Sequence, residues 1–115
     1  MTTTSKPSLD QESLLALRMV QSFQATVDEI CWQTSESDRA KTRHIGFHLT
    51  IAAGKLARVE ERHDHGVVDE AILDEVAADL LVYACQLATI RQRAIGDLYS
   101  QRVSMNLDRC IDNPG

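Results

Sequence analysis

The sequence has few aromatic residues, and it carries no surplus of positive charge. Aromatic side chains make up 4% of the 115 residues, so a hydrophobic core has to be built from aliphatic side chains. Lysine and arginine number 12 against 17 aspartates and glutamates, which gives a net charge of −5. This balance argues against general nucleic-acid binding, because such proteins gather basic residues against the phosphates.

Cysteine is also scarce. The three cysteines, Cys31, Cys85 and Cys110, lie far apart and form no CxxC pair. An odd number without close spacing predicts reduced thiols, as in a cytoplasmic protein, rather than a disulfide framework. All three fall on or beside apolar helix stripes, so we interpret them as small core residues.

Long apolar runs are absent as well. No stretch approaches the ~20 apolar residues that cross a bilayer, and the first residues lack the charged start and apolar run of a signal peptide. We therefore expect a cytoplasmic protein with no membrane partner. The length suits one small domain, which we place at residues 9–111, after a flexible N-terminus (1–8) and before a C-terminal tail (112–115).

Proline stands only near the two ends, at Pro7 and Pro114, and apolar residues recur between them at steps of three and four, which predicts an all-α fold of four helices. The first helix follows Ser8, which has capping-box spacing to Gln11. Its expected core-facing stripe comprises Leu14, Leu17, Val20, Phe23, Val27, Ile30 and Cys31.

The polar segment 33–38 should form the first loop. The second helix is expected from about 39 to 63, with Gly66 as its stop. The third is expected from 70 to 95 with Asp69 as its cap, and Asp97 should cap a short fourth helix.

The third predicted helix is apolar nearly all round, with Leu80, Tyr83 and Leu87 on one side and Leu81 and Ala84 on another. A helix of this kind is buried on most sides, so it is either central or part of a subunit interface. A small domain also buries a modest fraction of its surface. We therefore expect oligomerisation to complete the bundle, with at least a homodimer.

Two segments, Gly46–Ala57 and Asp74–Ala88, resemble the MazG-like all-α NTP pyrophosphohydrolases. In that family one helix reads approximately H-L-x-x-E-x-G-E-L-A and the next E-E-x-x-D-L-L-x-Y-A-x-x-L-A. Arg102 and Asn106 resemble the basic residue and the asparagine of the family's closing helix. The resemblance covers about residues 9–109 and implies a four-helix MazG-like bundle, dimers or higher assemblies, and a nucleotide ligand.

The family's metal chemistry meets a departure in this chain. Hydrolysis of an NTP to NMP and pyrophosphate uses Mg²⁺ to neutralise phosphate charge, and Mg²⁺ takes oxygen ligands. The family's four carboxylate positions correspond here to Ala52, Lys55, Val76 and Asp79, and only Asp79 is acidic. The resemblance therefore predicts a degenerate metal site, with no cofactor and no Mg²⁺-dependent hydrolysis.

Three functions remain open. The first is a MazG-like nucleotide-binding or helical assembly module, for which Lys55, His48, Arg102 and Asn106 are the substrate-binding candidates. The second is an active pyrophosphohydrolase with Mg²⁺ on a rearranged carboxylate set, with Asp79 and Glu75 as catalytic candidates. The third is a helical interaction protein that shares only a packing pattern with the family.

The replacement of a ligand by Lys55 suggests that its ammonium supplies the positive charge of the missing metal. We expect it to pair with Asp79, helped by Glu75, unless Lys55 simply points into solvent.

Other chemistry has weak support in the sequence. His44 and His48 have the i, i+4 spacing of zinc ligands, but no H-E-x-x-H pattern accompanies them. No glycine-rich phosphate loop is present. We interpret Phe23 and Trp32 as bulky core residues, with stacking on a nucleobase as the alternative.

Overall fold

The computed structural model describes residues 6–32 and 36–112. In these ranges the chain is all-helical and has no strand, which confirms the expected fold class. The four helices are α1 (Gln11–Cys31), α2 (Asp38–His63), α3 (Glu70–Ile90) and α4 (Ile95–Asp112). Residues 1–5, 33–35 and 113–115, which belong to the expected N-terminal segment, first loop and C-terminal tail, lie outside the described residues.

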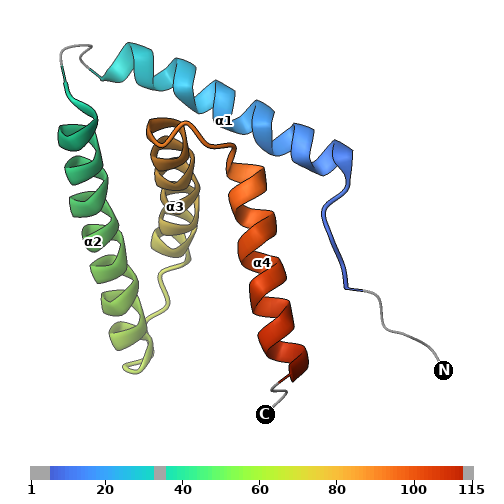
Figure 1. The fold of residues 1–115 in the computed structure, drawn as a ribbon. Coiled ribbons are helices and arrows are strands. Elements are labelled where there is room, and N and C mark those ends of the chain that lie inside the picture. Colours follow the sequence, from blue (N-terminus) through green and yellow to red (C-terminus); the bar gives the residue numbers. More distant parts are fainter. Residues whose placement is uncertain (1–5, 33–35, 113–115) are drawn as a thin grey trace.

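The helices form an open arrangement around α3. Helix α1 runs across one end, and α2, α3 and α4 extend away from it, with α3 between the other two (Figure 1). Helix α3 contacts each of the other three helices, whereas α2 contacts neither α1 nor α4 along the described chain. Among the described residues, α1, α3 and α4 therefore contact one another, whereas α2 packs on α3 alone.

Side-chain caps start the first three helices. Asp10, not Ser8, caps α1, because its Oδ1 accepts from the backbone N–H of Ser13 at 2.8 Å. This hydrogen bond also lowers the pKa of the Asp10 carboxyl. Ser37 caps α2, and Asp69 caps α3 as expected.

The ends of α2 and α3 share one hydrogen-bond pattern, a Schellman motif. After α2, the N–H of Val67 donates to the carbonyl of Arg62, and Gly66 has a φ of 84°. After α3, the N–H of Arg93 donates to the carbonyl of Ala88, and Gln92 takes the left-handed position with a φ of 55°. The end of α2 is visible in the sequence because Gly66 is the usual residue at this position. The end of α3 is not, because glutamine occupies the equivalent position.

The third helix consequently ends at Ile90 rather than 95, and the fourth begins at Ile95, with Asp97 in its first turn rather than before it. Gln21 of α1 holds this turn. Its amide donates to the carbonyl of Arg93 at 2.8 Å and accepts from the N–H of Ile95 at 2.8 Å. Gly96 lets α4 approach α1, because a Cβ there would lie 3.1 Å from Leu14 Cδ2.

The buried core is small. Its apolar members are Ile45, Ala52, Val59, Val76, Cys85 and Ala88. Helix α1 contributes no buried residue, so the expected burial of its apolar stripe is wrong for the single chain. Cys31 and Cys110 are exposed, and only Cys85 fits the expectation of a core cysteine.

The chain exposes far more surface than its mass requires. A compact 12.8 kDa protein exposes roughly 6,300 Å², whereas this chain exposes 9085 Å². Its radius of gyration is 17.6 Å, against about 13 Å for a compact domain of this length. In residues 6–32 and 36–112, none of the helices has both the length and the apolar character needed to cross a membrane.

Candidate functional site

Two of the four positions that the resemblance assigns to a carboxylate cage, Ala52 and Val76, pack between α2 and α3. Ala52 and Val76 are each 4% exposed. Neither side chain has an atom that can ligate a cation, so these residues do not fit a Mg²⁺ cage. Ala52 of α2 and Val76 of α3 instead belong to the apolar core.

We expected the residues at the other two positions, Lys55 and Asp79, to form an ion pair, and in the structure they do not. Lys55 Nζ lies 3.2 Å from Glu75 Oε1, and no ion pair joins it to Asp79. The preference follows from the helix register, because Glu75 lies one turn before Asp79 and meets Lys55 across the α2–α3 interface. Both partners are about half exposed, so the pair adds about 0–1 kcal/mol to stability.

Tyr83 shows that these charges nevertheless gather in one place. Burial raises the pKa of its phenol above 10.0; the negative charges of Asp79 and Glu75 raise it further, and Lys55 lowers it. The structure thus brings together four residues of the resembling segments: Lys55, Glu75, Asp79 and Tyr83. This group lies on the partly exposed rim of the α2–α3 pair.

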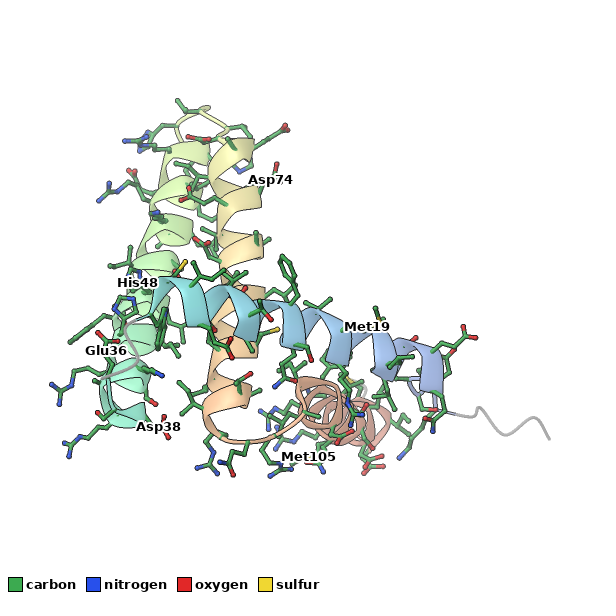
Figure 2. All side chains as sticks on the ribbon, turned by 90° about the horizontal axis from the view of Figure 1, so that it is seen from above. Met19, Glu36, Asp38, His48, Asp74 and Met105 are labelled. Carbon is green, nitrogen blue, oxygen red and sulfur yellow. The ribbon has the colours of Figure 1, made fainter. Side chains whose placement is uncertain are left out.

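His48 belongs to a row of rings that joins three elements. The ring centroids of Trp32 and His44 are 5.6 Å apart, those of His44 and His48 4.2 Å, and those of His48 and Tyr83 5.9 Å. Figure 2 shows His48 on α2 below the C-terminal end of α1. In the described part of the chain no three His, Cys, Asp or Glu side chains are grouped to hold a metal.

Arg102 and Asn106 lie apart from this group. Both are exposed on α4, and α4 makes no contact with α2 across the described helices. Within the single chain, the structure therefore does not bring these two candidates to Lys55.

A second cluster, which the sequence analysis missed, lies between the C-terminal halves of α1 and α3. Gln86 is the buried polar side chain of α3, with 7% exposure, and its Nε2 donates to Asp28 Oδ1 at 2.8 Å. Gln24 donates to the same oxygen at 3.0 Å. A pocket of about 200 Å³ opens beside Asp28, with Trp32 as its aromatic wall.

One sequence signal pointed to this cluster. Gln86 interrupts the apolar third helix and has to find a polar partner when buried. Asp28 likewise stands between the apolar residues Val27 and Ile30. Only the packing of α1 on α3 shows that these two residues meet.

Comparison of the chain with protein-family models, with curated proteins and with solved structures finds no match.

Proposed function

We propose that this chain is a MazG-like helical module that acts by self-association and nucleotide binding, without Mg²⁺-dependent hydrolysis. The observation that carries the proposal is the unpartnered apolar surface of a chain with a very small core. The excess over a compact monomer is about 2,800 Å². Obligate homodimers bury ~2,000–5,000 Å² over both subunits, or about 1,000–2,500 Å² for each chain, so a second copy accounts for much of this excess.

Helix α1 shows the need for a partner most clearly. Its polar residues Gln21 and Asp28 face α3 and the start of α4, where they form hydrogen bonds. Four apolar residues on the opposite side are more than half exposed, and two of them, Phe23 and Ile30, belong to the stripe expected from the sequence: Leu15, Met19, Phe23 and Ile30. Met19 projects from α1 away from α4 (Figure 2).

Helix α3 adds a second apolar face. Leu80, Leu81 and Leu87 are 37–48% exposed, and the exposed Ala84 between them extends the face. An exposed apolar patch of this extent is typical of an interaction surface. The face supports the interpretation of α3 as a helix of a subunit interface.

The loss of hydrolysis is supported by chemistry at the cage positions. Ala52 and Val76 provide packing atoms only, and the Lys55 ammonium repels a cation. Three free thiols agree with a reducing, cytoplasmic setting, which we include in the proposal.

Light scattering coupled to size exclusion tests the assembly. We expect a mass of at least twice 12.8 kDa at micromolar concentration. Leu81→Glu should shift the protein towards monomer, because a charge on the α3 face cannot be buried without a partner. Asp74→Asn, on the exposed surface of α3, is the matched control. A monomeric wild-type chain would contradict the proposal.

The second candidate function is an active pyrophosphohydrolase that holds Mg²⁺ on Glu75 and Asp79. The gathering of both carboxylates near Tyr83 favours it. Pyrophosphate release from a panel of NTPs and dNTPs, with Mg²⁺ or Mn²⁺, separates the two functions. Metal-dependent turnover that Asp79→Ala abolishes would establish the enzyme, whereas the proposed module shows no turnover.

A further inference from the structure

The pocket between α1 and α3 offers one aromatic wall and polar groups of both signs. Its volume is about 200 Å³, and its lining includes Ala25, Asp28, Glu29, Trp32, Lys41 and Ile90. This is smaller than the ~300–1,000 Å³ of pockets for drug-sized ligands. The space suits one flat heterocycle rather than a whole nucleotide.

The acceptor in this pocket is held in place before any ligand arrives. Gln24 and Gln86 both donate to Asp28 Oδ1, and the burial of Gln86 fixes its side chain. Asp28 Oδ2 has no hydrogen-bond partner among residues 6–32 and 36–112, and Asp28 lines the pocket. A preorganised carboxylate oxygen of this kind accepts an N–H from a ligand with little loss of side-chain entropy.

The aromatic wall is positioned by its neighbours. Trp32 is half-buried, and His44 packs edge-on against its indole at 5.6 Å. The Lys41 ammonium lies 5.6 Å from the indole centroid, at the same pocket. The pocket therefore combines a stacking surface with a donor, Lys41, and two acceptors, Asp28 and Glu29.

We propose that this pocket binds a guanine base. Guanine presents two neighbouring donors, N1–H and the 2-amino group, beside the acceptor O6, which matches carboxylates beside an ammonium. Uracil presents a single N–H between two carbonyl oxygens, which the carboxylates repel. Adenine has no oxygen for Lys41. The inference rests on the proposed nucleotide binding and names its base.

Trp32 is the single tryptophan of the chain, so its fluorescence reports on this pocket directly. We expect GMP to quench it saturably, after correction for absorption with free tryptophan. IMP, which lacks only the 2-amino group, should bind at least about tenfold more weakly, and UMP should not quench. Asp28→Asn should weaken GMP binding about tenfold or more, because each lost charge-assisted bond costs ~1.5–3 kcal/mol.

Asp74→Asn is the matched control, since it removes one negative charge near the other end of α3, far from α1 (Figure 2). It should leave GMP binding unchanged. Circular dichroism verifies that both variants fold. Because Trp32→Phe removes the fluorescent group, its affinity for GMP is measured by calorimetry, which gives the contribution of the indole to stacking. Equal quenching by GMP, IMP and UMP would overturn the guanine assignment.

Calorimetry also separates this inference from the proposed function. If a nucleotide binds without changing Trp32 fluorescence, and binds the Asp28→Asn variant with the same affinity, the assignment to this pocket is overturned but the proposed nucleotide binding stands. If an intact oligomer binds no nucleotide, the guanine pocket and the proposed nucleotide binding are both overturned, and only the proposed self-association stands.

Discussion

The two ends of α3 differ in how sequence relates to chemistry. Near the N-terminal end, Glu75 and Asp79 belong to a segment that resembles a family motif, yet the facing helix offers Ala52 and one lysine. Near the C-terminal end no motif is present, yet Gln86 meets Asp28 of α1 beside a pocket. A site depends on what the facing helix supplies. One buried polar residue in the sequence is therefore a better predictor of a site than half of a family motif.

The strongest way to break this comparison is to restore the missing ligands. In an Ala52→Glu, Lys55→Glu, Val76→Glu variant, two carboxylates enter a buried interface. We expect a loss of about 3 kcal/mol or more without metal, because unpaired buried charges are costly. Mg²⁺ should then raise the melting temperature of the variant, since a ligand of the folded state stabilises it.

The wild-type chain is the control, and its melting temperature should not respond to Mg²⁺. A variant that melts identically with and without Mg²⁺ would count against any relation to the family's cage.

The next largest effect should come from the other end of α3. Gln86→Ala removes the buried amide that donates to Asp28, and we expect a loss of about 1–3 kcal/mol in urea unfolding, as for an orphaned polar partner. Asp79→Ala, on the partly exposed rim, should change stability by about 0.5 kcal/mol or less. Equal losses for the two variants would remove the distinction between the ends.

A substitution at Gln92, just beyond the C-terminal end of α3, should stabilise the protein. Gln92 adopts a φ of 55°, and the left-handed region costs a side chain about 1–2 kcal/mol. Gln92→Gly removes this cost but adds freedom to the unfolded chain. We expect a net gain of about 0.5–1 kcal/mol, measured as a higher urea midpoint. Gln101→Gly, inside α4, is the contrasting variant and should destabilise.

The smallest effect concerns the Lys55–Glu75 pair. Lys55→Met should cost about 0–1 kcal/mol, and this cost should shrink in high salt. The ammonium lowers the pKa of Tyr83 against the raising effect of burial and two carboxylates. Its removal should therefore move the Tyr83 titration to higher pH, measured by tyrosinate absorbance in a Tyr99→Phe background because the chain has a second tyrosine. An unchanged Tyr83 titration would place Lys55 away from the cluster.

Much of the fold followed from the sequence, because helical periodicity and the caps at Asp69 and Gly66 are local signals. The boundary between α3 and α4 did not follow, since Gln92 occupies a position where glycine is the usual signal. The proximity of Lys55, Glu75 and Asp79 could be predicted from helix spacing. Which carboxylate pairs with Lys55 could not, because it depends on the offset between α2 and α3.

The position of α1 also escaped prediction. Periodicity predicted one apolar stripe, but in the structure Leu14 and Leu17 lie close to Gly96 of α4, whereas Phe23 and Ile30 are exposed. It could not say that Gln21 and Asp28 would lie on the packed side. A stripe that packs on a partner and one that packs on its own chain have the same sequence pattern.

The placement of α1 has a consequence for the order of folding. Helices α2 and α3 are neighbours in the chain, whereas Gln21 bonds to Arg93, 72 residues away. Closing such a long loop has an entropic cost that adjacent helices avoid, so α1 should dock late and detach early. The pocket at Trp32 exists only while α1 is docked, and any ligand that fills it therefore slows the first step of unfolding.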